Sequence, residues 1–324
     1  MVKLASAEMA EKKLATRAAF GATLAELAEE GVPVVAVDAD LTGSTTTKKF
    51  AAAAPENADK LFNCGIAEQN MIDVAAGLAL TGHVAYTGSF AVFGTGRAYD
   101  QIRNTVCYSN LDVKICPTHA GVSVGPDGGS HQMLEDISLM RGLPNMRVLV
   151  PADYAAARAA IKLAAKTPGP VYVRMGRAAV PCVYDDDVEL EIGRAYVLRE
   201  GSDATVVACG VEIREALAAA DMLAEEGVSI EIIDAFSVKP LDEGTITASV
   251  AKTGCCVVAE EHSVHGGLGS AVAECLARKN PAPCEFVGVQ DRFGKSGEFE
   301  ELLGYFNLDA AAIVEAVKRA RGRK

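Results

Sequence analysis

Short β-rich runs alternate with helical patterns along most of this 324-residue chain. In its first half the strand-like runs lie at 32–40, 83–88, 111–119, 146–153 and 169–177, and helical patterns lie between them, at 96–109 and 131–143 among others. Strands separated by helices are normally joined as βαβ units, which build parallel sheets covered by helices. The sequence therefore predicts an α/β fold made of mostly parallel sheets with helices on both faces.

The alternation is interrupted at 178–193, where the sequence contains a proline, three consecutive aspartates and no helical period. We interpret this segment as a linker or a small hairpin. A second series of strand and helix patterns follows it, at 204–210, 213–227, 228–236, 254–262, 267–279 and from 308 onward. A chain of this length can bury two hydrophobic cores. We expect two α/β domains, at 1–178 and 194–324, joined by a linker at 179–193.

Composition and charge exclude several classes of protein. Hydrophobic residues make up 50% of the chain, which is typical of globular domains, and the formal net charge of −12 argues against a nucleic-acid partner. No apolar run is long enough to span a bilayer, and charges are scattered through 1–20, where a signal peptide has an apolar core. The nine cysteines include no C-x-x-C pair, which is typical of free thiols in a reducing compartment. We expect a cytoplasmic protein with neither a zinc site nor a membrane partner.

Glu68 begins a helix that is apolar on nearly every face, since only Asp73 interrupts the apolar run after Met71. A helix of this kind is buried, and it draws a carboxylate in its first turn toward the interior. A buried carboxylate needs a partner or stays protonated, and such groups concentrate at functional sites. Glu68 is therefore a candidate functional residue.

Other candidate side chains follow the predicted strands directly. Ligands of open α/β sheets bind at the carboxyl ends of strands, so these side chains are candidates for one shared cleft. Each also has a structural explanation, since a glycine-rich segment can serve only to form turns and phenylalanine is commonly a core residue. His83 carries no functional prediction, and His262 and His265 are expected in a loop. The candidates are Phe90, Phe93, His119, Asp127, His131 and Arg174.

Three motifs carry a resemblance to a known family. The segment 64–174 resembles the pyrimidine-binding domain of transketolase and 1-deoxyxylulose-5-phosphate synthase, through "GIAEQNM", "GPDGGSHQ" and "PNMRVLVPAD" in this order and at these spacings. The second half resembles the transketolase C-terminal domain, so the match covers essentially the whole chain. The resemblance implies the thiamine diphosphate-binding fold, with this chain supplying its pyrimidine module.

The resemblance implies roles around this cofactor. Glu68 matches the buried glutamate that hydrogen-bonds N1′ of the aminopyrimidine and, by sharing a proton with it, helps the cofactor to form its reactive carbanion. Phe90 and Phe93 match aromatic residues that pack on this ring, and Asp40 matches an acid near the thiazolium. A tyrosine expected three residues after Phe93 is replaced by Gly96, so one wall of the pyrimidine pocket is left unassigned.

The same resemblance implies a site for a sugar phosphate. Arg17, Ser44 and Arg174 match phosphate ligands, and guanidinium groups suit a phosphate because they bind its oxygens in pairs. The groups that match those holding the sugar hydroxyls and the reacting centre are His119, Asp127 and His131. Glu68 and His131 are the predicted catalytic residues.

One part of a complete transketolase is missing from the sequence. The family's diphosphate-binding domain is marked by a G-D-G motif and a paired asparagine, and neither occurs here in a matching context, while residues 1–16 start directly on a helix-like segment. We therefore expect the C-terminal subunit of a split transketolase. Its active site would form with a separate N-terminal, diphosphate-binding subunit that also holds Mg²⁺ or Ca²⁺, in an α2β2 heterotetramer.

The implied reaction is the transfer of a two-carbon ketol unit between sugar phosphates, as in the pentose phosphate pathway. Two alternatives stay open. The β subunit of a 2-oxo acid dehydrogenase E1 component has the same layout and also needs a partner chain, although the phosphate ligands favour sugar phosphates. A catalytically silent regulatory subunit could share the fold, but it would have no chemical need of Glu68 and the histidines.

Overall fold

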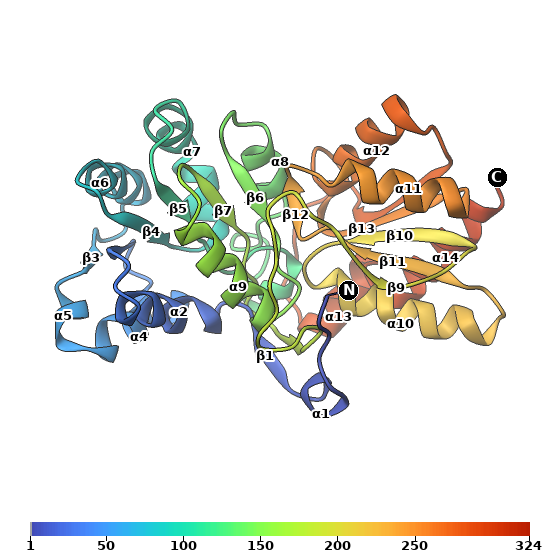
Figure 1. Ribbon diagram of the computed structural model, residues 1–324, viewed down its shortest axis with the longest axis horizontal. Coiled ribbons are helices and arrows are strands. Elements are labelled where there is room, and N and C mark those ends of the chain that lie inside the picture. Colours follow the sequence, from blue (N-terminus) through green and yellow to red (C-terminus); the bar gives the residue numbers. More distant parts are fainter. Residues whose placement is uncertain (1) are drawn as a thin grey trace.

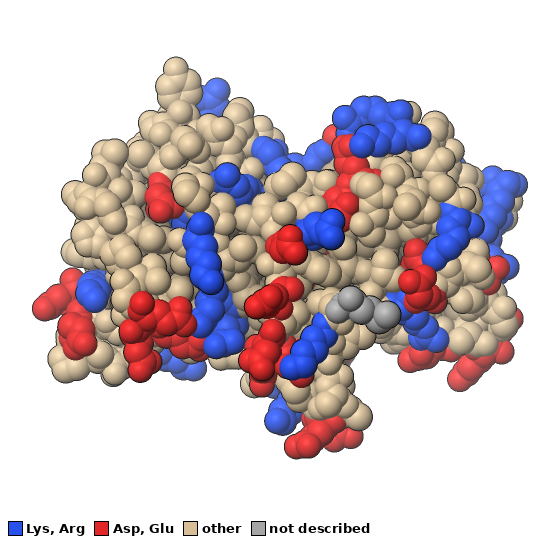
Figure 2. Space-filling view, in the orientation of Figure 1, with Lys and Arg blue, Asp and Glu red and all other residues tan. Residues whose placement is uncertain are grey.

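Two mostly parallel β-sheets form the two halves of the molecule, and helices cover both faces of each sheet (Figure 1). The structure is a computed structural model and describes residues 2–324. The predicted fold class is confirmed. On the face drawn in Figure 2, Lys and Arg side chains lie among Asp and Glu side chains. In the part of the chain that is described, no helix combines the length and apolar character that crossing a membrane requires.

Within residues 2–324 the first sheet has seven strands, in the order β12-β6-β7-β5-β4-β2-β3. Its neighbouring strands are parallel, apart from the pair β12 and β6. The strands are β2 (Val34–Asp38), β3 (Leu61–Asn63), β4 (Val84–Gly88), β5 (Val113–Ile115), β6 (Arg147–Leu149), β7 (Val171–Val173) and β12 (Ser237–Lys239). Because parallel strands end at the same edge, the loops after β2, β3, β4, β5 and β7 meet on one side of the sheet.

Side chains of the central strands alternate between two core layers. In β2, Val34 and Ala36 belong to the layer that contains α2 and α9. Val35 and Val37 belong to the opposite layer, with α6 and α8. Both faces of the strand are thus covered, which explains its continuous apolar run. The helical segments of this half are α1 (Ala7–Ala10), α2 (Ala18–Glu29), α3 (Thr42–Thr45), α4 (Thr47–Ala53), α5 (Pro55–Ala58), α6 (Glu68–Leu80), η1 (Val92–Arg97), α7 (Tyr99–Gln101), η2 (Ile102–Cys107), η3 (Val122–Asp127), α8 (Asp136–Arg141) and α9 (Tyr154–Ala165).

Two predicted helices differ from the structure. The helix expected at 96–109 forms as the π-helical segments η1 and η2 on either side of α7, and π-turns are frequent at functional sites. The helix expected at 131–143 is confined to α8. Tertiary contacts hold the residues before it, since the Gln132 side chain bonds the backbone of Lys295 and Met133 pairs with Ala120. His131 therefore lies in an irregular loop.

Within the described residues the second sheet has five strands, in the order β14-β13-β10-β11-β9, and β9 runs antiparallel to β11. The strands predicted at 204–210, 228–236 and 254–262 are confirmed, as are the helices at 213–227 and 267–279. The strands are β9 (Tyr196–Arg199), β10 (Ala204–Ala208), β11 (Ile230–Asp234), β13 (Cys256–Ser263) and β14 (Cys284–Val289). The helices are α10 (Glu212–Glu225), α11 (Glu243–Thr253), α12 (Leu268–Lys279), α13 (Phe299–Phe306) and α14 (Ala310–Arg321).

The two halves are joined more closely than a simple linker implies. β8 (Ala179–Pro181) pairs antiparallel with β1 (Lys13–Ala15), so the hairpin interpretation of 178–193 is wrong: this segment pairs with the start of the chain. β12, which follows β11 in the chain, joins the first sheet antiparallel to β6. The domain boundaries stay a prediction, with one strand of the second half built into the first sheet.

Candidate active site

The carboxylate of Glu68 lies inside the protein, at the first turn of α6 and shortly after β3. Its side chain is 2% exposed, and Oε2 accepts a hydrogen bond of 2.8 Å from Nη1 of Arg97, whose side chain is 48% exposed. Met71 and Ile72 share the buried face of the helix with it. The predicted burial of Glu68 is confirmed, and the structure adds an ion-pair partner that the sequence did not indicate.

Four rings from three segments form a continuous cluster beside this ion pair. The ring centroids of Phe90 and Phe93 are 6.1 Å apart, and His119 stacks on Phe90 at 3.7 Å. His131 meets both phenylalanine rings edge-on, at 6.2 and 5.4 Å. The guanidinium of Arg97 lies 4.6 Å from the centroid of the Phe93 ring and so links the cluster to Glu68. The predicted residues that the structure brings together are Glu68, Phe90, Phe93, His119 and His131.

His119 is held in a strained and buried position. Its backbone has a left-handed φ of 61°, a conformation that clusters at functional sites, and its Nδ1 lies 2.7 Å from Oγ1 of Thr118. Burial, followed by the charges of Arg17 and Arg177 and the neighbouring His131, lowers the pKa of His119 from 6.5 to about 3. The imidazole is therefore neutral near pH 7 and can donate or accept a hydrogen bond to a sugar hydroxyl.

Arg17 and Arg177 line a cavity of about 260 Å³, to which Phe299 of the second half also contributes. Nη1 of Arg17 donates a hydrogen bond of 2.7 Å to the backbone oxygen of Ser44, so these two predicted residues do meet. Burial and the charge of Arg177 lower the pKa of Arg17. Oγ of Ser123, which also lines the cavity, is buried without a hydrogen-bond partner among residues 2–324. Two guanidinium groups and a free hydroxyl suit an anion such as a phosphate group, although Glu298 also lines the cavity.

Arg174, predicted as a phosphate ligand, is buried instead in an ion pair with Asp136. Its Nε lies 2.7 Å from Oδ2 and its Nη2 3.2 Å from Oδ1 of that residue, and Nη2 also donates to the backbone oxygen of Glu261 at 2.9 Å. Burial by itself would lower the pKa of Arg174, but the Asp136 carboxylate raises it overall. Because its donors are committed and its side chain is buried, the structure does not support Arg174 as a phosphate ligand.

Two candidate functional residues, Arg97 and Arg177, were not predicted from the sequence. Arg177 follows Arg174 by three residues, and both lie after β7. Arg174 comes directly after the strand and is buried, whereas Arg177 lies farther along the loop and is partly exposed. Arg97 carried no prediction, although it directly follows Gly96, where the sequence departs from the family pattern.

Asp40 and Asp127 are exposed and lie outside the ring cluster. Asp40 has a left-handed φ of 65°, and its Oδ1 accepts a hydrogen bond of 3.3 Å from Nδ2 of Asn63. Asp127 ends the 3₁₀ segment η3. Their roles near the thiazolium and the sugar stay predictions.

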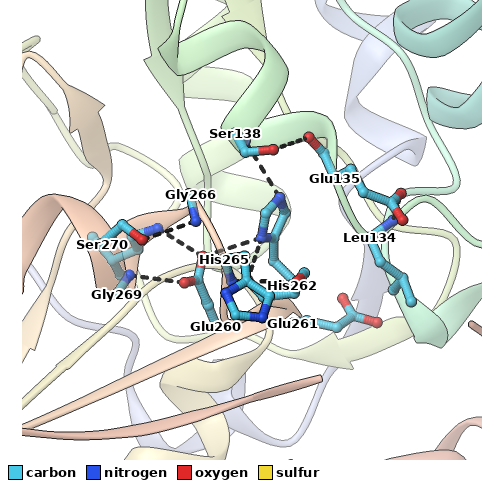
Figure 3. A network of polar contacts seen from close by, with 12 residues as sticks. Leu134, Glu135, Ser138, Glu260, Glu261, His262, His265, Gly266, Gly269 and Ser270 are labelled. Atoms are coloured by element: carbon cyan, nitrogen blue, oxygen red, sulfur yellow. Dashed lines mark hydrogen bonds and ion pairs between the residues drawn. The ribbon is translucent and has the colours of Figure 1, made fainter. Parts of the chain in front are cut away.

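A buried polar network joins the two halves (Figure 3), and Arg174 donates a hydrogen bond to the backbone oxygen of Glu261 in it. His262 lies on β13 and not in the expected loop; its Nε2 accepts a hydrogen bond of 3.3 Å from the backbone N–H of Ser138, and its Nδ1 donates to the backbone oxygen of Ser263 at 2.7 Å. Glu260 accepts hydrogen bonds from the first two N–H groups of α12, at 2.7 and 2.8 Å. We name as the interdomain joint the residues Asp136, Arg174, Glu260, Glu261 and His262.

Comparison with known proteins assigns a family to both halves. The family model described as transketolase, pyrimidine binding domain, matches residues 12–183, and the one described as transketolase, C-terminal domain, matches residues 193–313. A relative from Methanocaldococcus jannaschii, described as a transketolase C-terminal section, is 45% identical over 304 residues, which cover 93% of this chain and 94% of the relative. A 6-deoxy-6-sulfo-D-fructose transketolase subunit from a Clostridium strain is 41% identical over 301 residues, which cover 93% and 92%.

A solved structure described as a split-gene transketolase in an inactive β4 tetramer has the same fold throughout. Its chain is 48% identical to this one and superposes with a TM-score of 0.87, over 96% of this chain and 99% of the other. The similarity thus extends through both halves and over nearly the full length of these relatives. The chain belongs to the transketolase family, where it corresponds to the C-terminal section of a split transketolase.

Proposed function

We propose that this chain is the pyrimidine-binding subunit of a thiamine diphosphate-dependent transketolase, which transfers a two-carbon ketol unit between sugar phosphates. The observation that carries the proposal is the buried carboxylate of Glu68 beside the paired rings of Phe90 and Phe93. An aminopyrimidine needs a carboxyl group for its ring nitrogen and an apolar aromatic face for its ring. The residues present fit both needs.

Glu68 would hold the proton at N1′ of the ring, and Phe90 and Phe93 would support the ring itself. When bound, the cofactor supplies the carbanion that attacks the carbonyl of the donor sugar. The neutral imidazole of His119, together with His131, would bond the hydroxyl groups and the reacting oxygen of the substrate, and the contacts of both rings with Phe90 and Phe93 support this role. Asp40 and Asp127 keep their predicted places beside the thiazolium and the sugar.

The substrate's phosphate group would lie in the cavity of Arg17 and Arg177, and the backbone oxygen of Ser44 accepts a hydrogen bond from Arg17. Arg177 takes the role that the sequence analysis gave to Arg174. The Clostridium relative is named for a sulfonated sugar, and a sulfonate is an anion like phosphate, so a basic pocket at the end of the sugar suits both.

The diphosphate and its Mg²⁺ or Ca²⁺ would be held by a separate N-terminal subunit, in an α2β2 heterotetramer. The relative that forms an inactive β4 tetramer supports the need for a partner. All nine cysteines are free thiols, which supports a reducing compartment such as the cytoplasm. Both family matches are to transketolase domains, which favours sugar phosphates over the 2-oxo acids of the dehydrogenase alternative.

The test is a titration of thiamine diphosphate with Mg²⁺ into this chain alone, and then into its mixture with a diphosphate-binding transketolase subunit from the same source. Ketol transfer from xylulose 5-phosphate is followed in parallel. We expect binding and transfer only in the mixture. Turnover by the chain alone would contradict the need for a partner, and a mixture that binds cofactor but transfers nothing would favour a silent regulatory subunit.

A further inference from the structure

Arg97 directly follows Gly96, the position at which the sequence analysis left one wall of the pyrimidine pocket unassigned, and a Cβ added at Gly96 would meet only open space. Arg97 ends η1, four residues after Phe93. Its Nη1 lies 2.8 Å from Oε2 of Glu68, and its guanidinium carbon lies 4.6 Å from the centroid of the Phe93 ring. One side chain thus contacts both groups that the proposed function gives to the pyrimidine ring, the carboxylate and the aromatic face.

Phe90, the other phenylalanine of the cluster, has one face of its ring covered by His119, so this face is not free to receive the pyrimidine ring. The His119 ring is stacked on Phe90 at 3.7 Å, and it is buried and held by Thr118. Of the two side chains that cover the phenylalanine rings, His119 and Arg97, it is Arg97 that can move, because its side chain is 48% exposed. Glu68, at 2% exposed, is fixed by the buried face of α6.

We propose that Arg97 is a positioning residue that stands in for the pyrimidine ring: it occupies Glu68 and Phe93 in the free chain and leaves them when the ring binds. This inference rests on the proposed function. A guanidinium pairs with the ionised carboxylate, whereas the ring nitrogen shares a proton with it. Arg97 also lies over the Phe93 ring that the proposed function gives to the pyrimidine, so the two compete for one place. The pairing lowers the apparent affinity for the cofactor by the fraction of chains in which Arg97 is in place.

The stand-in also has a use. A buried carboxylate without a partner is unfavourable, and the ion pair meets that need until the cofactor arrives. The contact holds the Glu68 carboxylate next to the guanidinium that covers the Phe93 ring.

The experiment measures the Kd of thiamine diphosphate, at saturating Mg²⁺, by calorimetry on the complex of this chain with its diphosphate-binding subunit. The variants are Arg97→Ala, which removes the competitor, and Arg97→Lys, which keeps the charge. Arg103→Ala is the matched control, since Arg103 is exposed on the following segment and donates to the neighbouring Asn104.

Arg97→Ala should lower the Kd about fivefold, the size expected when an ion pair with one exposed partner no longer competes. Arg97→Lys and Arg103→Ala should stay within about twofold of the wild type. In a Glu68→Gln background the Arg97→Ala change should no longer tighten binding, because Arg97 acts through the charge of Glu68.

An unchanged or raised Kd in Arg97→Ala would overturn the stand-in role, and a raised Kd would make Arg97 a ligand of the cofactor. These results are distinct from a failure of the proposed function, in which the wild-type complex itself binds no thiamine diphosphate. In that case both the function and the stand-in role are wrong.

Discussion

The interdomain joint and the cleft both contain charged side chains, but these side chains have different partners in the two regions. By the cleft we mean Glu68, the ring cluster and the cavity of Arg17 and Arg177. In the joint, Arg174 and Asp136 are buried and bonded to each other. In the cleft, Arg17 and Arg177 face one cavity, and burial together with their charges keeps His119 neutral. Opposite charges that pair with each other hold two segments together, whereas cations that line a cavity can bind an anion there.

The two arginines after β7 make the difference concrete. Arg174 and Arg177 are three residues apart, yet one is committed to a carboxylate and the other donates to the backbone oxygen of Val124 at 2.8 Å beside the open cavity. Residue type alone therefore does not identify a ligand. The partners that the fold supplies decide which arginine is available.

The largest effect is expected at Glu68, on the cleft side of the comparison. Glu68→Gln should lower kcat of the reconstituted complex about 1,000-fold, because an amide does not exchange a proton with the ring nitrogen. The rate of ketol transfer at saturating cofactor is the measurement. Glu56→Gln, at an exposed glutamate of α5, is the control and should keep the wild-type rate. A Glu68→Gln rate within a few fold of the wild type would remove Glu68 from the catalytic role.

On the side of the joint, Arg174→Met should lower the free energy of unfolding by about 3 kcal/mol, because it leaves the Asp136 carboxylate buried without its charge partner. Tyr172 still donates to Asp136 at 2.6 Å, which limits the loss. Urea unfolding measures the change. Adding Asp136→Asn should recover part of the stability, and Arg177→Met should change it by less than about 1 kcal/mol. Equal losses from the two arginine variants would erase the distinction between joint and cleft.

Another buried carboxyl, that of Asp234 on β11, predicts a pH dependence. Burial raises the pKa of Asp234 from 3.8 to about 7, although the hydrogen bond of 2.5 Å from the Tyr184 hydroxyl opposes the shift. Between these two values the folded state binds more protons than the unfolded state, so stability falls as the pH rises.

We expect Asp234 to lower the free energy of unfolding by about 2 kcal/mol between pH 5 and pH 7. Asp234→Asn should remove this pH dependence, so that the stability of the variant relative to the wild type increases as the pH rises. Urea unfolding of both proteins at several pH values measures it. A constant difference between them across the range would show that Asp234 does not titrate there.

The smallest effect is expected at the phosphate cavity. Arg177→Gln should raise KM for a phosphorylated sugar about tenfold and leave KM for its unphosphorylated analogue unchanged, because one charge-assisted hydrogen bond to the phosphate is lost. Steady-state kinetics of the reconstituted complex with both substrates test it. If KM rises equally for both sugars, Arg177 does not read the phosphate.

Local sequence patterns were sufficient to predict those elements whose burial follows from their own apolar residues. The apolar run of β2 predicted a buried strand, and the apolar turns of α6 predicted the burial of Glu68, because the hydrophobic effect depends on side chains that are visible in the sequence. The helix itself is buried on one face only, since Leu80 at its end is 73% exposed. The family motifs added Phe90, Phe93 and His119, and the fold brings these rings into contact.

Other features depend on residues that are far apart in the chain. β12 joins a sheet whose other strands end some 60 residues earlier, and β8 pairs with a strand near the start of the chain. The loop of His131 is held out of a helix by contacts with the second half. No local pattern records such pairings, since each depends on what the rest of the fold places opposite.

The alternation of strands and helices, the α/β class and the burial of Glu68 were thus determined by the sequence itself, through periodicity and hydrophobicity. Only the tertiary structure decided that Arg174 forms an ion pair with Asp136, that Arg177 lines the cavity and that Arg97 forms an ion pair with Glu68. The reason is that an ion pair depends on distance and burial, and both are set by segments that meet only when the chain has folded.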